Sequence, residues 1–149
     1  MLYLHVFRQL NNINNDITAI DTALLVIRLA MRKFAPLMTW IALTEEQQLN
    51  TIKDQSLGQP VVIFKHSTRC SISSMAKNRL EREQAPENAL FYYLDLIKYR
   101  PVSNKIAEDF SVHHESPQVL LIRNGECVYE ESHNGISMGE IIEQVQLAN

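Results

Sequence analysis

The order of apolar and polar segments predicts an α/β protein with a mixed, four-stranded sheet flanked by helices. Three observations support this prediction. An unbroken apolar run at 61–64 is typical of a central strand covered on both faces. A helical segment separates this run from a second strand at 89–96, as in a right-handed parallel βαβ unit. The dipeptide Asn124-Gly125, between two further apolar runs, predicts a β-hairpin that adds antiparallel strands.

Residues 1–37 precede this pattern, and we separate them as an N-terminal extension from a domain at 38–149. The extension carries apolar side chains at alternating spacings of three and four, which predicts an amphipathic helix. Two interpretations stay open. The helix packs on the domain, on a partner or on a membrane surface, or the translated chain begins at Met38. The apolar positions are Ile17, Ile20, Leu24, Ile27, Met31 and Phe34.

Three helices are predicted between residues 44 and 110. The first begins with a capping-box pattern, Thr44 with Gln47, and ends near Gly58. The second begins at Cys70, and the third covers 103–110. Their expected inward side chains are Leu49 and Ile52 in the first helix, Ile72, Met75, Ala76 and Leu80 in the second, and Ile106, Ala107 and Phe110 in the third.

The last third of the chain is predicted to hold the hairpin and a closing helix. Strands at 119–122 and 127–131 flank the Asn-Gly turn, and Gly135 marks another turn. The closing helix covers 136–147. Its expected inward side chains are Ile141, Ile142 and Val145.

Composition restricts the classes of function. The chain has 149 residues, enough for one domain with a sizeable core, and its formal net charge of −3 does not suggest nucleic-acid binding. The most apolar stretch, 23–31, is short and contains Arg28, so no membrane span is expected. Two cysteines, with no secretory signal pattern, indicate a reducing compartment rather than a disulfide scaffold. We therefore expect a cytoplasmic protein.

Cys70 is the main candidate for chemistry. It stands where a strand gives way to a helix, and the N-terminal end of a helix favours an anion such as a thiolate. Lys65 and Arg69 add positive charge nearby, and Ser67 and Thr68 are residues that favour the start of a helix. The alternative is a small buried hydrophobic cysteine. The apolar run stops at 64, which favours a reactive thiol.

Two motifs resemble those of the monothiol bacilliredoxins, the YtxJ family. They are His66-Ser67-Thr68-Arg69-Cys70-Ser71-Ile72-Ser73 and, far downstream, His114-Glu115-Ser116-Pro117-Gln118. The resemblance extends from about residue 38 to 149 and implies a thioredoxin-like fold. The family usually has proline after the cysteine, where this chain has Ser71, and in thioredoxin-type motifs the residue at this position tunes the redox potential of the thiol.

The resemblance implies thiol–disulfide exchange through Cys70 alone, which removes a small thiol, bacillithiol, from mixed disulfides on client proteins. Residues alone do not choose bacillithiol over glutathione or a related thiol. No tightly bound cofactor and no metal site is expected, and the partners are S-thiolated clients rather than nucleic acid or membrane. The alternative function is a thioredoxin-fold binding module or redox sensor without turnover.

The other site residues follow from the same motifs. Arg69, Thr68 and Ser73 would support the thiolate, and Ser73 is either a simple first-turn residue or a hydroxyl partner of the sulfur. The resemblance implies a cis Ser116-Pro117 bond that lies beside the cysteine and binds substrate together with His114 and Glu115. Cys127 is interpreted as a packed strand residue, with a resolving thiol as the alternative.

Overall fold

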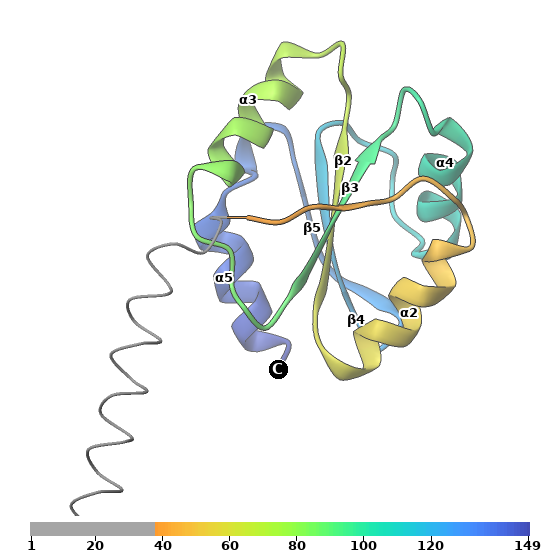
Figure 1. Cartoon of the computed structure of the whole chain (residues 1–149), viewed down its shortest axis with the longest axis vertical. Helices are drawn as coiled ribbons and strands as arrows, with labels where there is room; N and C mark the ends of the chain where they lie inside the picture. Colours follow the sequence, from red (N-terminus) through yellow and green to blue (C-terminus); the bar gives the residue numbers. More distant parts are fainter. Residues whose placement is uncertain (1–37) are drawn as a thin grey trace, which may run out of the picture. The chain divides into compact units, whose positions relative to one another are not determined.

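The computed structural model describes residues 38–149, which form a mixed sheet of five strands in the order β1-β3-β2-β4-β5 (Figure 1). The helix predicted at 17–34 lies outside the described residues. The strands are β1 (Ile41–Ala42), β2 (Val61–His66), β3 (Leu90–Asp95), β4 (Gln118–Arg123) and β5 (Glu126–Ser132). The helices are α2 (Gln48–Gly58), α3 (Ser71–Glu81), α4 (Arg100–Asp109), α5 (Met138–Leu147) and the 3₁₀ turn η1 (His133–Gly135).

The α/β class and the mixed sheet are confirmed, but the strand count of four was too low. The additional strand, β1, has two residues and pairs in parallel with β3, Ile41 opposite Tyr92. So short a strand leaves no alternation in the sequence from which to predict it. The other strands were found within two residues of their bounds, because each contains a longer apolar run.

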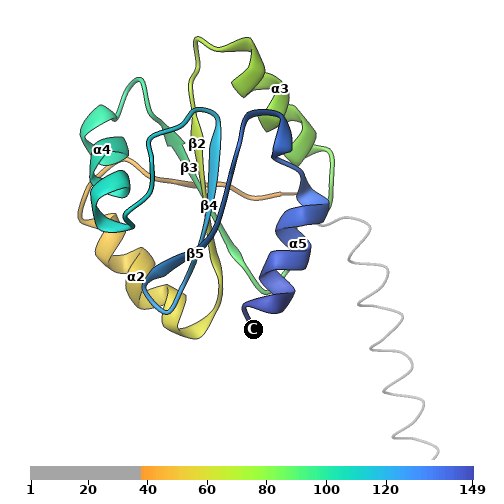
Figure 2. The same ribbon diagram turned by 180° about the vertical axis from the view of Figure 1, so that it is seen from behind.

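The central strand β2 pairs in parallel with β3 and antiparallel with β4, and all six of its residues are buried. Its alternate side chains enter two separate cores. Val62 and Phe64 pack with residues of α3 and α5, whereas Val61 and Ile63 pack with residues of α2 and α4. Figures 1 and 2 show the two helix pairs on opposite faces of the sheet.

The pairing register brings distant segments to two ends of the sheet. Lys65 of β2 is opposite Gln118 at the start of β4, so the end of β2 and the segment before β4 share one end. Val61 is opposite Ile122, so the start of β2 lies at the hairpin end. The predicted Asn-Gly turn is confirmed there, with Asn124 and Gly125 both at positive φ, 54° and 81°.

The beginnings of two helices differ from the prediction. The amide oxygen of Gln48, not Gln47, reaches back to accept from Thr44 N at 2.7 Å, so the capping residue is one position later. Helix α4 begins at Arg100, three residues before the predicted start, because Pro101 in its first turn is compatible with a helix start.

The predicted inward face of α3 was partly wrong. Ala76 and Leu80 are buried as expected, but Ile72 and Met75 are 41% and 52% exposed. The helix begins at Ser71 and turns Ser73 toward the sheet, which directs the spacing 73-76-80 inward. In α5, the predicted Ile141 and Val145 are buried and Ile142 is partly buried against the same core, although the helix begins at Met138 rather than 136.

Candidate functional site

Cys70 lies where β2 ends, at the N-cap position of α3. Its backbone is extended, with φ −110° and ψ 122°, and its carbonyl accepts the first helical hydrogen bond from Ser74 N at 3.0 Å. Its own N–H donates to Ser67 O at 3.1 Å, which closes the turn after the strand. The free thiol is half-buried. The unpaired N–H groups of a first helical turn favour an anion at this position.

Thr68 and Arg69 lie in the turn between β2 and Cys70, and both are exposed. Neither Ser67 nor Thr68 starts the helix, since Cys70 itself takes the N-cap position. The exposed guanidinium of Arg69 belongs to the residue next to the cysteine, so it adds positive charge to the solvent face of this turn.

Ser73 is fully buried in the first turn of α3. Its Oγ accepts from Ser67 N at 3.0 Å and lies 2.7 Å from His66 Nδ1. A neutral imidazole pairs with this hydroxyl either as acceptor or as donor. Burial, followed by the charge of Lys77, lowers the pKa of His66, which favours the neutral ring. His66 is therefore the side-chain partner of a hydroxyl that the sequence offers either as a first-turn residue or as a partner of the sulfur.

The second motif, 114–118, runs from the segment 113–117 into the start of β4. The Ser116-Pro117 bond is cis, as expected. Pro117 is buried, and its carbonyl accepts from His133 N of η1 at 3.0 Å. The hydroxyl of Ser116 is buried without a hydrogen-bond partner in the part of the chain that the structure describes. Since Gln118 pairs with Lys65, this segment lies at the same end of the sheet as Cys70.

His114 and Glu115 contact different neighbours. Glu115 Oε2 lies 3.0 Å from His133 Nε2, so this carboxylate is directed toward η1. His114 Nδ1 lies 3.3 Å from the buried Nζ of Lys65, and its Nε2 lies 3.2 Å from Arg100 Nη1. Burial, then the charges of these two cations, lowers the pKa of His114. A neutral ring accepts at only one of its two nitrogens, so it accepts from Lys65 or from Arg100 but not from both.

Two residues of this network were not identified as site residues from the sequence. Lys65 is fully buried, and Gln118 is 1% exposed and accepts from Lys65 Nζ at 2.7 Å. Lys65 was noted only as a charge near Cys70. The sequence does contain a signal for each. Lys65 is a charged residue directly after the apolar run of β2, and Gln118 is an amide directly before the apolar run of β4.

Cys127 lies at the other end of the sheet. It is opposite Ile122, which is opposite Val61, whereas Cys70 follows the far end of β2. At 3.3 Å per residue, the length of β2 alone separates the two levels by about 16 Å, more than twice the reach of a disulfide. Its thiol donates to Tyr129 O at 3.3 Å, and burial, followed by Glu130, raises its pKa to about 11. The packed-strand interpretation is the one that the geometry supports.

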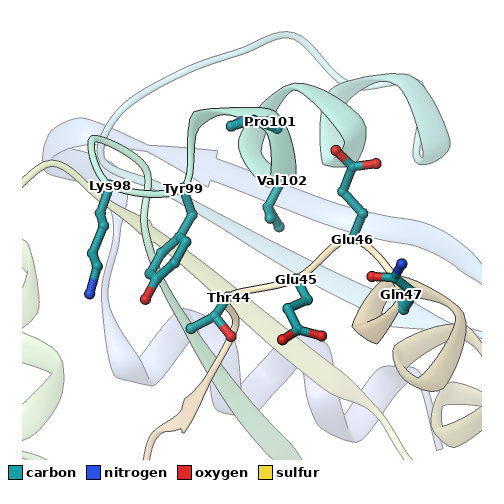
Figure 3. Close-up of a pocket in the computed structure, with 8 residues that line it drawn as sticks. All are labelled: Thr44, Glu45, Glu46, Gln47, Lys98, Tyr99, Pro101 and Val102. Atoms are coloured by element: carbon teal, nitrogen blue, oxygen red, sulfur yellow. The ribbon is translucent and has the colours of Figure 1, made fainter.

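A shallow hollow of about 390 Å³ opens between the loops that follow β1 and β3 (Figure 3). Its lining includes Thr44, Glu45, Tyr99 and Val102. None of the residues predicted for the thiol site contributes to it. The thiol site and this hollow are therefore different features of the surface.

No three His, Cys, Asp or Glu side chains within residues 38–149 are placed to hold a metal ion. None of its helices is both long and apolar enough to cross a membrane.

Comparisons with known proteins agree with this geometry. A solved protein described as a candidate oxidoreductase with a thioredoxin fold is 29% identical, with a TM-score of 0.62 over 69% of this chain and 90% of its own. Thioredoxins of Malassezia sympodialis and Fasciola hepatica are 15% and 17% identical, with TM-scores of 0.59 and 0.56. They cover 76% and 72% of this chain, and 94% and 98% of their own, which shows the thioredoxin fold.

A family model places the chain more narrowly. The model described as monothiol bacilliredoxin BrxC matches residues 41–141, more than half of the sequence. The matched range includes both motifs on which the resemblance was based, 66–73 and 114–118. With a redox thiol function supported by both the family and the fold, this chain belongs to the monothiol bacilliredoxin family.

Proposed function

We propose that this protein removes a low-molecular-weight thiol from mixed disulfides on client proteins, with Cys70 as its only reacting thiol. The observation that supports this proposal most is the position of Cys70 at the N-cap of α3, half-buried and free. The family name adds bacillithiol as the expected small thiol. The reaction belongs in a reducing compartment, so we propose the cytoplasm as its location.

The first step is attack by the Cys70 thiolate on the small-thiol sulfur of the mixed disulfide. A new disulfide forms between Cys70 and the small thiol, the original disulfide breaks, and the client leaves as a thiolate that takes up a proton. A second molecule of reduced small thiol then attacks the small-thiol sulfur on Cys70. This step releases an oxidised small-thiol dimer and regenerates the Cys70 thiolate. The small thiol is a co-substrate, and no tightly bound cofactor is required.

A one-thiol mechanism fits the surroundings of Cys70. The position three residues later, which carries a second cysteine in two-thiol enzymes, is Ser73, and a hydroxyl cannot resolve a mixed disulfide. Cys127 lies at the opposite end of the sheet. The small thiol bound to Cys70 must therefore leave by attack from a second molecule.

We propose the segment 113–117 as the client-binding element. It lies at the same end of the sheet as Cys70, and the family resemblance assigns Ser116 and Pro117 to contact with an extended client chain. His114 and Glu115, in the same segment, would border the bound client. Arg69 and Thr68, exposed in the turn before Cys70, would contact the small thiol or the client next to the reacting sulfur.

Mass spectrometry of the protein after reaction with an S-thiolated client tests the proposal. Separate reactions use clients carrying bacillithiol, glutathione or cysteine. The expected result is a reduced client together with one small-thiol adduct on Cys70, formed fastest with bacillithiol. Repeated turnover with excess reduced thiol distinguishes an enzyme from a sensor, which would stop after one equivalent. A protein that leaves every client thiolated would contradict the proposed function.

A further inference from the structure

Lys65 is a charged residue in an otherwise apolar position. It lies in β2, between Phe64 and His66, and no part of its side chain is exposed. Its side chain is on the α2 and α4 face of the sheet, the face to which Val61 and Ile63 also point. Burial of an ammonium is costly unless hydrogen bonds and nearby charges compensate it. The contacts of its ammonium group therefore indicate a role for Lys65 beyond packing.

Through its first contact, Gln118, Lys65 is linked to the backbone of residues 113 and 115. Its Nζ donates to Gln118 Oε1 at 2.7 Å, and the same oxygen accepts from Glu115 N at 3.3 Å. The amide nitrogen of Gln118 donates to His113 O at 2.9 Å and to Glu130 Oε2 at 3.0 Å. The side-chain amide of Gln118 thus binds the backbone of both His113 and Glu115. Because Lys65 donates to Oε1, it orients this amide with Oε1 toward Glu115 N and Nε2 toward His113 O.

The second contact of Lys65 is His114, the residue between 113 and 115. Lys65 Nζ lies 3.3 Å from His114 Nδ1, and Ser103 Oγ of α4 lies 3.3 Å from the same atom. An ammonium only donates, and a neutral imidazole accepts at one ring nitrogen alone, so Lys65 favours the tautomer whose Nδ1 accepts. The buried end of His114 is therefore anchored to β2 and α4, although the residue itself is exposed.

The charges that face Lys65 come from three elements. Glu130 of β5 and Glu115 favour its ammonium, whereas Arg100 of α4 opposes it. Burial outweighs these charges and lowers the pKa of Lys65 to about 8. The lysine thus keeps its proton at neutral pH without a carboxylate in direct contact. The groups that its proton does contact are Gln118 and His114.

We propose that Lys65 is a positioning residue, whose buried ammonium orients Gln118 and His114 and thereby holds the segment 113–117 in the form that binds client protein. This inference rests on the proposed function, in which that segment binds the mixed disulfide presented to Cys70. Lys65 does not touch the reacting sulfur in this scheme. It acts through the backbone of residues 113–115, so its loss affects client binding more than thiol chemistry.

The test compares Lys65→Met with the unmodified full-length protein. Methionine keeps the length of the side chain and removes its donors. We expect kcat/KM for an S-thiolated client protein to fall about ten- to a hundredfold, mainly through a higher KM, as loss of a charge-assisted hydrogen bond predicts. The alkylation rate of Cys70 with iodoacetamide, which needs no client-binding segment, should stay within about twofold. Lys65→Arg should recover part of the lost kcat/KM, because it restores a buried cation.

The matched control is Lys53→Met. Lys53 lies on α2, and its Nζ pairs with Asp109 Oδ2 of α4 at 2.9 Å, so its replacement should leave client turnover and Cys70 alkylation unchanged. If Lys65→Met does not fold, Gln118→Met replaces it in the same assay. Wild-type-like kcat/KM in the folded variant, or equal losses in client turnover and iodoacetamide alkylation, would overturn the inference. A wild-type protein without client turnover would instead overturn the proposed function, and this inference with it.

Discussion

The two cysteines occupy opposite ends of the same sheet, and these ends differ in features that bear on our proposal that only Cys70 takes part in exchange. At the Cys70 end, β2 and β3 finish and β4 begins, and the chain gathers a helix N-terminus, a buried lysine and a half-buried thiol. At the Cys127 end, a tight hairpin packs against the core of α2 and α4. Parallel strands bring loops and helix N-termini to one end only, and chemistry concentrates there.

The two thiols differ in their surroundings rather than in their degree of burial. Both cysteines are half-buried. Cys127 donates to the carbonyl of Tyr129 and lies near the carboxylate of Glu130, which opposes ionisation. Cys70 has a helix N-terminus and Arg69 beside it. The four predictions that follow test this contrast, beginning with the largest expected effect.

Replacing each cysteine in turn by serine should separate the two ends completely. Cys70→Ser should abolish release of a small thiol from a client protein, since no nucleophile remains at that end. Cys127→Ser should keep most of the activity, because a one-thiol mechanism needs no internal partner. Release of the small thiol, followed by mass spectrometry, provides the measurement. Equal losses in both variants at unchanged melting temperature would identify Cys127 as a resolving thiol.

Alkylation against pH should separate the two thiols in the unmodified protein. With a pKa of about 11, only about one Cys127 in a thousand is a thiolate at pH 8, and the fraction rises tenfold with each pH unit until the pKa is approached. Cys70 should therefore be labelled at pH 8 long before Cys127. Peptide mapping after timed iodoacetamide treatment measures both rates. In denaturant the two rates should converge, and similar rates in the folded protein would contradict the contrast.

Ser73→Ala tests whether the hydroxyl near Cys70 serves the fold or the thiolate. The substitution leaves His66 Nδ1 and Ser67 N–H without their partner, so we expect a loss of about 1–3 kcal/mol of stability. The alkylation rate of Cys70 at neutral pH should stay within about twofold, because His66 is the side-chain partner of the hydroxyl. Urea melts and alkylation rates measure the two effects. Slower alkylation with unchanged stability would show that Ser73 supports the sulfur instead.

Sequence patterns predicted the scaffold better than the polar network within it. The run at 61–64 and the Asn-Gly turn led to β2 and the hairpin, because long apolar runs and positive-φ turns leave local signals. The position of Cys70 at a helix start was found in the same way. The burial of Lys65 was not, since a lysine after an apolar run is usually at the surface. Only the pairing of β2 with β4 brings Gln118 to it.

The face of α3 was mispredicted for a related reason. Ile72 and Met75 fit an apolar stripe, but the chain enters the helix so that Ser73 faces the sheet and bonds to His66. A buried hydrogen bond between residues seven positions apart, across the turn, leaves no periodic signal. Ser73 belongs to the motif shared with the family. Only the folded structure shows that the partner of its hydroxyl is the imidazole of His66.

Deletion of residues 1–37 should have the smallest effect and tests whether either end of the sheet depends on the extension. Among the described residues, Met38 and Trp40 are the first side chains packed against the core that contains α3 and α5. The match to the family begins at residue 41. We therefore propose 38–149 as an independent domain, whose urea midpoint and client turnover should equal those of the full chain.

If the helix predicted at 17–34 instead covered an apolar face, its loss would expose several aliphatic side chains, each worth about 1.5–3 kcal/mol when fully buried. The midpoint would then drop sharply, since typical domains have only about 5–15 kcal/mol of stability.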